Sequence, residues 1–228
     1  MLYLDGRSLH LTDVVAVADA HVLVALAPEA RARMHDTRAV VDRAVARGEP
    51  VYGINTGFGK LSEVTIPLEQ LTLLQRNLVR SHAAGVGDAL PEREVRAMML
   101  LRANVLATAY AGARPALIDT LLAMLNAGLW PVVPEQGSVG ASGDLAPLAH
   151  LALALIGEGP ARYQGREDRA DALMAVAGIS PAVLEAKEGL ALINGTQAHT
   201  AVAGLACAEL TRLWGVAHVA TAMTLEAL

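Results

Sequence analysis

Hydrophobic residues recur along most of the chain with the spacing of one helix face, and prolines and glycines divide this pattern into segments. Several segments have a proline near the first turn and a glycine just after the last turn. This arrangement is typical of helices, because proline suits the first turn and glycine readily adopts the left-handed backbone that ends a helix. We therefore predict helices over residues 12–20, 28–47, 67–79, 91–110 and 115–127.

The other segments before residue 196 are shorter or less regular. Residues 1–10 predict a short strand and a turn, and residues 51–60 predict a loop, because three glycines in seven residues oppose a regular helix. Residues 162–167 predict a surface hairpin followed by a short helix. The pair at residues 180–181, serine then proline, predicts the start of another helix that closes near Gly189.

The last segment, residues 196–228, is a helical pattern with apolar side chains on every face and only three charged residues. A helix of this kind is normally buried in a bundle or an oligomer, and the charges make a membrane span the weaker option. We expect Cys207 to be a small buried side chain. The pattern has no stop signal before Leu228, so we expect the chain to be part of a longer protein.

Composition favours a mainly α fold. Hydrophobic residues make up 54% of the chain, yet aromatic residues make up only 3%, and strands prefer aromatic and β-branched side chains. The net charge of −5, without a basic block, argues against nucleic acid or an anionic membrane as a partner. A single cysteine excludes a disulfide within the chain. The first residues lack a signal-peptide pattern, which predicts a cytoplasmic location.

Residues 137–150 combine a glycine-rich turn with the start of a helix, where Asp144 suits the N-cap and Pro147 the first turn. Within this stretch Ala141-Ser142-Gly143 joins an unhindered glycine amide, a serine that can lose water and a small preceding residue. If the turn presses the Gly143 nitrogen against the Ala141 carbonyl carbon, ring closure and loss of two waters give a 4-methylidene-imidazol-5-one, an uncharged electrophile. Asp144 would then be a base or an orienting acceptor, or only the cap of its helix.

Three segments resemble the aromatic amino acid lyase family, which includes ammonia-lyases and aminomutases: residues 137–150, 52–59 and 192–197. They follow the family order across essentially the whole chain. The resemblance implies a mainly α fold, a homotetramer whose active sites combine three subunits, and a length about twice that of this chain. It also implies that residues 1–195 form the catalytic region bearing the methylidene-imidazolone, and that residues 196–228 begin the central helical bundle.

The resemblance also implies roles for individual residues. Ser142 would carry the methylene that receives the substrate amine, and Tyr52 would be the base or proton shuttle for the β-proton. Asn194 would bond the ring oxygen or orient the amine, and Phe58 would line or close the pocket. Without the family, Tyr52 would be a packing residue, and Asn194 a turn residue because Asn-Gly favours turns. Two further positions would support the site: Gly59 and Asp144.

Substrate choice depends on residues 80–85, which most resemble the histidine-specific ammonia-lyases. There His82 would face the substrate ring and exchange hydrogen bonds with an imidazole. The implied reaction converts L-histidine to trans-urocanate and ammonia. Alternatives are a tyrosine or phenylalanine ammonia-lyase, an aminomutase, or an inactive piece that keeps only the fold and association. No metal is expected, because the spacing of the remaining candidates is not that of a metal site: His150, His199 and His218.

Overall fold

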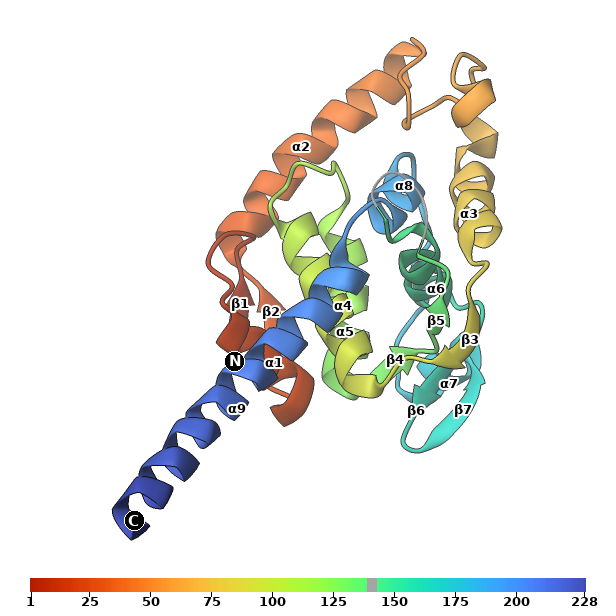
Figure 1. Ribbon diagram of the computed structural model, residues 1–228. Helices are drawn as coiled ribbons and strands as arrows, with labels where there is room; N and C mark the ends of the chain where they lie inside the picture. Colours follow the sequence, from red (N-terminus) through yellow and green to blue (C-terminus); the bar gives the residue numbers. More distant parts are fainter. Residues whose placement is uncertain (139–142) are drawn as a thin grey trace.

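The computed structural model describes residues 1–138 and 143–228, and it is mainly helical, as predicted (Figure 1). The helices are α1 Leu11–Ala20, α2 Pro28–Arg47, α3 Leu71–His82, α4 Glu92–Ala107, α5 Pro115–Ala127, α6 Leu145–Leu155, α7 Ala170–Val176, α8 Glu188–Ile193 and α9 Gln197–Ala227. The strands are β1 Leu2–Leu4, β2 Val24–Leu26, β3 Val86–Ala89, β4 Leu129–Pro131, β5 Pro134–Gln136, β6 Pro160–Tyr163 and β7 Arg166–Arg169.

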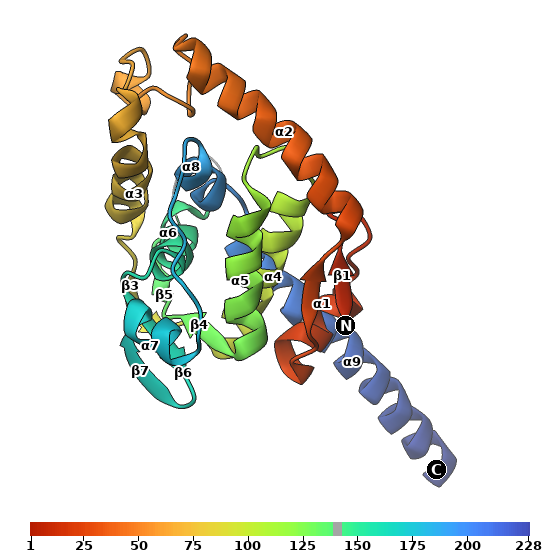
Figure 2. The ribbon, with the colours of Figure 1, turned by 180° about the vertical axis from the view of Figure 1, so that it is seen from behind.

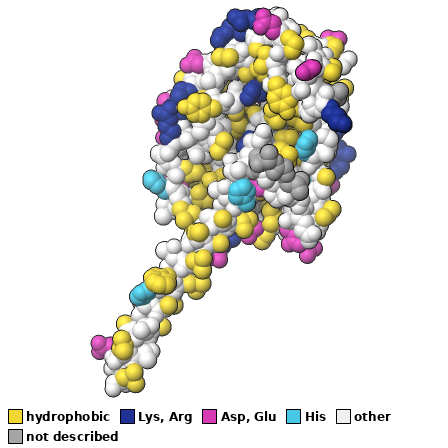
Figure 3. Space-filling view, turned by 45° about the horizontal axis from the view of Figure 1, so that its top comes forward, with side chains coloured by type: hydrophobic (Ala, Val, Ile, Leu, Met, Phe, Trp, Pro, Cys, Tyr) yellow, Lys and Arg dark blue, Asp and Glu magenta, His cyan; other side chains and the backbone are white. Residues whose placement is uncertain are grey.

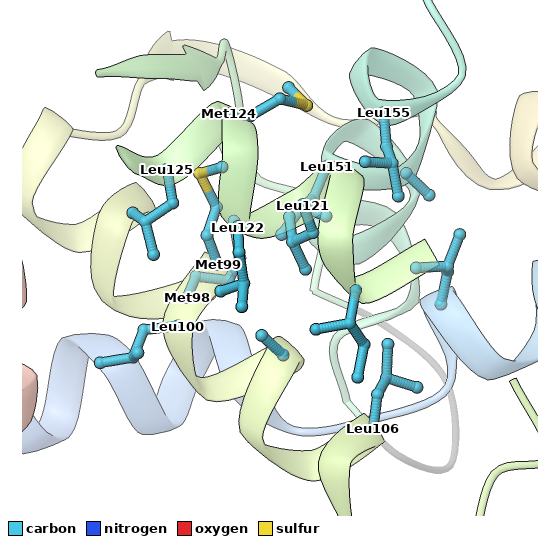
Figure 4. Close-up of a cluster of buried hydrophobic side chains, with 14 of the residues drawn as sticks. Met98, Met99, Leu100, Leu106, Leu121, Leu122, Met124, Leu125, Leu151 and Leu155 are labelled. Carbon is cyan, nitrogen blue, oxygen red and sulfur yellow. The ribbon is translucent and has the colours of Figure 1, made fainter. Parts of the chain in front are cut away.

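The core lies around α4, which packs against α1, α5 and the first turns of α9. A second group, formed by α3, α6 and α8, packs together beside it (Figures 1 and 2). Leucine and methionine side chains fill the space between α4, α5 and α6 (Figure 4). These residues come from the predicted apolar helix faces, so burial of those faces joins the helices into one body.

The strands form small sheets at the edges of this helical body. β1 and β2 pair in parallel, β3 and β5 pair antiparallel, and β4, β6 and β7 form an antiparallel sheet. The β6–β7 hairpin and the first strand confirm two of the predictions. β2 and β3 were not predicted, because each is short and pairs with a strand distant in sequence, so local alternation gives little signal.

The predicted helix after residues 180–181 is wrong. Residues 181–187 form no helix; instead the Ala182 amide donates to the Leu155 carbonyl at 2.9 Å, and Lys187 has a left-handed φ of +74°. The Ala182 amide is thus bonded to a carbonyl distant in sequence and not within a local helix. α8 begins only at Glu188, and Gly189 lies inside it rather than at its end. A Cβ on Gly189 would lie 2.8 Å from the Gln75 carbonyl oxygen, so this glycine permits close packing of α8 on α3.

Two helix boundaries also differ from those expected. α4 ends at Ala107 rather than near residue 110, since Ala109 has a left-handed φ of +72°. The helix expected from residue 67 starts as a 3-10 turn at Leu68–Gln70, and α3 then continues to His82. The later end of α3 matters for the site, because it makes His82 the last residue of that helix.

The long helix α9 has two unlike parts. Its first turns are buried through Gln197, Ala198, Ala201 and Leu205, whereas the remainder projects from the body (Figure 1) and carries exposed hydrophobic side chains (Figure 3). The expected burial of the whole segment is therefore not found within this chain, and Cys207 is exposed rather than buried. None of the helices in the described residues combines the length and apolar character needed to cross a membrane.

Candidate active site

Helices α3, α6 and α8 pack together, and α9 also contacts α6. The Gly85 amide, just after α3, donates to His150 Nε2 on α6 at 3.0 Å. The His199 amide, in the first turn of α9, donates to Asp144 Oδ2 at 3.0 Å. These bonds join the end of α3 and the start of α9 to α6 and its N-cap residue.

Asp144 is the N-cap residue of α6, and its side chain connects α6 to α9. Its side chain is fully buried, and it makes no capping hydrogen bond to α6. Its Oδ1 accepts from Ser138 Oγ at 2.8 Å, and its Oδ2 lies 3.0 Å from both the His199 amide and His199 Nδ1. His199 is the third residue of α9, so the carboxylate caps that helix and complements its dipole. Asp144 is thus the N-cap residue of α6, as predicted, but its carboxylate bonds Ser138 and α9 instead of the first turn of α6.

Gly143 is the one member of the tripeptide that the structure describes. Its φ of +94° lies in the region that favours glycine. A Cβ at this position would lie 3.6 Å from His199 Cε1 and Nδ1, so the imidazole covers one side of the residue. Ser138 Oγ also hydrogen-bonds the Gly143 carbonyl. Ala141 and Ser142 lie outside the described residues.

His82 is held by its own helix. Its Nδ1 lies 2.9 Å from the Leu78 carbonyl oxygen and 3.1 Å from Ser81 Oγ. The carbonyl can only accept, so a hydrogen on Nδ1 satisfies it, and in that tautomer Nε2 is an acceptor. Nearby His150 accepts the Gly85 amide through Nε2, and burial lowers the pKa of His150 below its ordinary value. The two histidines therefore differ: His150 supports the backbone, whereas His82 keeps one ring nitrogen for another partner.

The loop that carries Tyr52 is fixed at its base. Asn55 is buried, accepts the Val51 amide at 2.8 Å and donates to the Glu49 carbonyl at 2.9 Å. A Cβ on Gly53 would lie 2.7 Å from Leu190 Cδ2, so the loop packs closely on α8. Tyr52 itself is 58% exposed. The structure thus brings Tyr52 to α8, the helix that ends beside Asn194.

The Tyr52 ring meets Phe58 edge to face, with ring centroids 6.1 Å apart. Phe58 is partly buried and packs against the main hydrophobic core. Phe58 therefore packs on the core, and its expected role of lining the pocket stays a prediction. Gly59 begins the 3-10 turn Gly59–Leu61 with a left-handed φ of +58°, which is a structural reason for glycine there.

Asn194 follows the last residue of α8, and its side chain is exposed. Its carbonyl accepts from Arg102 Nη2 at 3.1 Å. Arg102 is a residue near the site that the sequence analysis missed. An arginine on an otherwise apolar face of α4 was the available signal, since a buried charge requires partners.

A cavity of about 290 Å³ flanks the same helix ends, and Ser138, Asp144 and His199 are among its lining residues. A larger cavity of about 340 Å³ lies elsewhere, beside Arg38 and Leu71. Within the described ranges, no group of three or more histidine, cysteine, aspartate or glutamate side chains is placed to hold a metal ion.

Comparison with known proteins gives consistent matches. The family model for aromatic amino acid lyases matches residues 9–228. The histidine ammonia-lyase of Anaeromyxobacter sp. (strain K) is 57% identical over the whole chain, which covers 46% of that relative. The solved histidine ammonia-lyase of Trypanosoma cruzi is 41% identical with a TM-score of 0.83, over 90% of this chain and 38% of that one. Ergothionase from Treponema denticola is 32% identical with a TM-score of 0.89, over 93% of this chain and 42% of that one. The chain thus spans less than half the length of these relatives.

Proposed function

The chain belongs to the aromatic amino acid lyase family, and from this premise we propose that the intact protein eliminates ammonia from L-histidine to give trans-urocanate. The observation that carries the proposal is the 57% identity to a histidine ammonia-lyase over the whole chain. The orientation of His82 supports the same substrate. Its Nε2 is an acceptor in the neutral ring, so it suits the N–H donor of a substrate imidazole.

We further propose that Ala141-Ser142-Gly143 becomes a 4-methylidene-imidazol-5-one. Gly143 fits this group, because its left-handed φ is a geometry that another residue would adopt only with strain. When formed, the group supplies an electrophilic methylene that takes up the substrate amine and makes it a better leaving group. Asp144, buried and fixed between α6 and α9, orients the end of the tripeptide.

The remaining steps fall to side chains around these helix ends. Removal of the β-proton requires a base beside the substrate, and we assign this role to the Tyr52 hydroxyl, whose loop is packed on α8. Asn194 provides an amide that can donate to developing negative charge or accept from the substrate amine. The aromatic pair formed by Tyr52 and Phe58 provides an apolar wall beside these polar groups.

The proposal includes a homo-oligomer, a tetramer in the resembled family. The distal part of α9 supports it, because exposed side chains such as Leu213 and Trp214, which is 71% exposed, form an apolar surface along a projecting helix. Packing of these helices against one another would remove that surface from water. Sedimentation of the intact protein tests this part separately from catalysis; a monomer at micromolar concentration would contradict it.

The function is tested by incubating the intact protein separately with L-histidine, L-tyrosine and L-phenylalanine. We expect urocanate from L-histidine, followed by its ultraviolet absorbance, with much slower formation of coumarate or cinnamate. Intact-mass analysis should show the loss of two waters localised to residues 141–143. Faster elimination from L-tyrosine than from L-histidine would show that the proposed substrate is wrong. An unmodified tripeptide in an active protein would refute the proposed electrophile.

A further inference from the structure

Two buried arginines lie on α4, Arg96 and Arg102, and each is only 2% exposed. Both donate to uncharged oxygens at the ends of other helices. Burial of a guanidinium is costly and is tolerated only when its donors are used. Both residues therefore stabilise helix ends. They differ in which helix ends they bond.

Arg96 serves the end of the molecule away from the candidate site. Its Nε and Nη2 donate to the Val17 carbonyl at 3.2 and 3.0 Å, and its Nη1 donates to the Leu125 carbonyl at 3.1 Å. These carbonyls lie in the last turns of α1 and α5, where carbonyls lack the regular amide partners of the helix interior; Leu125 also accepts the Gly128 amide. Arg96 thus holds helix ends that carry none of the proposed site residues.

Arg102 holds the turn on both sides of Asn194. Its Nη2 donates to the Asn194 carbonyl at 3.1 Å and also to the Ala191 carbonyl in the last turn of α8. Its Nη1 donates to Gln197 Oε1, in the first turn of α9, at 2.6 Å. One planar guanidinium therefore fixes the end of α8, the main chain at Asn194 and the start of α9.

The turn has little room for another arrangement. A Cβ on Gly195 would lie 2.3 Å from Arg102 Nη1 and 2.1 Å from Gln197 Oε1, so the backbone passes directly over the guanidinium. Burial lowers the pKa of Arg102 to about 10, and the group therefore remains charged at neutral pH. Among the described residues its Nε has no hydrogen-bond partner. This buried, unpaired donor costs folding free energy, which the bonds from Arg102 to the turn must offset.

We propose that Arg102 is a positioning residue for elimination: by holding the main chain before, at and after Asn194, it sets where the Asn194 amide is presented. The inference rests on the proposed function, because it assigns Asn194 a part in the reaction. It differs from a purely structural role in one respect. Loss of Arg102 should matter for catalysis only as long as Asn194 is present.

The test compares Arg102→Met with the matched control Arg96→Met in the intact protein. We expect Arg102→Met to lower kcat about 100-fold, the size of effect produced by misplacing a catalytic group by about 1 Å, with a smaller change in KM. Arg96→Met should change kcat by only a few-fold, although both variants lose a buried guanidinium. Arg102→Lys, which keeps the charge but not the planar fork, should recover only part of the activity.

A double-mutant cycle separates positioning from general damage. In an Asn194→Ala background, Arg102→Met should cause only a few-fold further loss, whereas Arg96→Met should cause the same change in both backgrounds. Full additivity of Arg102→Met with Asn194→Ala would overturn the inference. If Arg102→Met does not fold, Gln197→Leu removes one partner of Arg102 and should show the same non-additivity with Asn194→Ala at a smaller size.

Hydrogen exchange tests the inference without an activity assay. Amides over residues 190–200 should exchange faster in Arg102→Met, or in Gln197→Leu, while Arg96→Met leaves them unchanged and accelerates exchange at the ends of α1 and α5. Unchanged exchange over residues 190–200 would refute the proposal that Arg102 holds the main chain around Asn194. An unmutated protein without activity on any of the three amino acids would instead refute the proposed function, and the exchange comparison would still decide the role of Arg102.

Discussion

The groups that support the candidate site and the groups assigned to its chemistry differ in burial. Asp144, Glu188 and Arg102 are buried at 0 to 2% exposure and have hydrogen-bond partners within the chain. Tyr52 is 58% exposed, and the Asn194 side chain is also exposed. The chain therefore builds a supporting frame, defined here as Asp144, Glu188 and Arg102, and displays the chemical groups at its surface.

This difference has a physical basis. Each buried charge of the frame must recover its lost hydration through specific partners, so removal of one partner leaves the other uncompensated. Displayed groups keep water as a partner, and their loss costs little folding free energy. The comparison predicts that changes in the frame lower stability, whereas changes in the displayed groups lower elimination and leave stability unchanged.

The strongest test of the assigned chemistry is Ser142→Ala in the intact protein. This change removes the Ser142 Oγ, which must leave as water for the proposed methylene to form, so elimination should fall to the uncatalysed background. The midpoint of urea unfolding should stay the same, because no part of the frame is altered. Urocanate absorbance and urea titration measure the two quantities. Elimination at the parent rate would refute the role of Ser142.

The largest effect on the frame should come from Glu188→Ala. The Glu188 carboxylate is fully buried and accepts from the Arg114 side chain at 2.7 and 2.9 Å, from the Arg114 amide and from the Glu185 amide. Its removal leaves the Arg114 guanidinium without its main partner, and breaking a buried pair costs about 3–5 kcal/mol. We expect that loss in the free energy of unfolding of this chain, measured by urea titration.

The matched control for Glu188→Ala is Asp119→Ala. Asp119 pairs with Arg31 at 2.6 Å, but their side chains are 47% and 40% exposed. Such surface pairs contribute about 0–1 kcal/mol. Equal losses from the two substitutions would show that burial does not separate the frame from the surface, and the comparison would then fail.

A smaller effect, on catalysis alone, is expected from Tyr52→Phe. The substitution keeps the ring that meets Phe58 edge to face and removes only the hydroxyl. General acid–base groups contribute about 10²–10⁴-fold, so kcat should fall by at least about 100-fold. The free energy of unfolding should change by less than about 0.5 kcal/mol. A Tyr52→Phe protein with the parent kcat would show that a group other than Tyr52 abstracts the proton.

The groups assigned to the chemistry could be proposed from the sequence, whereas the frame could not. Tyr52, His82 and Asn194 stand in local motifs, and so does the tripeptide. The frame depends on pairs distant in sequence, such as Arg102 with Gln197 and Asp144 with His199, for which no local pattern exists. Asp144 illustrates the limit: its position before a helix predicts a cap on α6, but the fold brings the start of α9 within reach of its carboxylate.

The same limit explains the errors in the fold. Proline and glycine located α2 and α5 well, since both residues act through local backbone geometry. Residues 181–187 carry the same kind of local signal, yet they are held by Leu155, Arg114 and Arg38 from other parts of the chain. Helix propensity amounts to tenths of a kcal/mol per residue, which buried ion pairs and tertiary hydrogen bonds readily exceed.

The smallest expected effect concerns His150. Its side chain is half-buried, so its exposure is intermediate between that of the frame and that of the displayed groups. Burial lowers the pKa of His150 in the folded chain, while in the unfolded chain it stays near about 6.5. Between these two values the unfolded chain binds more protons, so stability falls as the pH drops through about 6.5 and levels off below the folded pKa. Protonation of Nε2 also removes the acceptor of the Gly85 amide. Urea titrations of the parent and His150→Gln between about pH 5 and pH 8 should therefore differ in slope below pH 6.5, with the variant less sensitive to acid; parallel profiles would show that His150 is not coupled to folding.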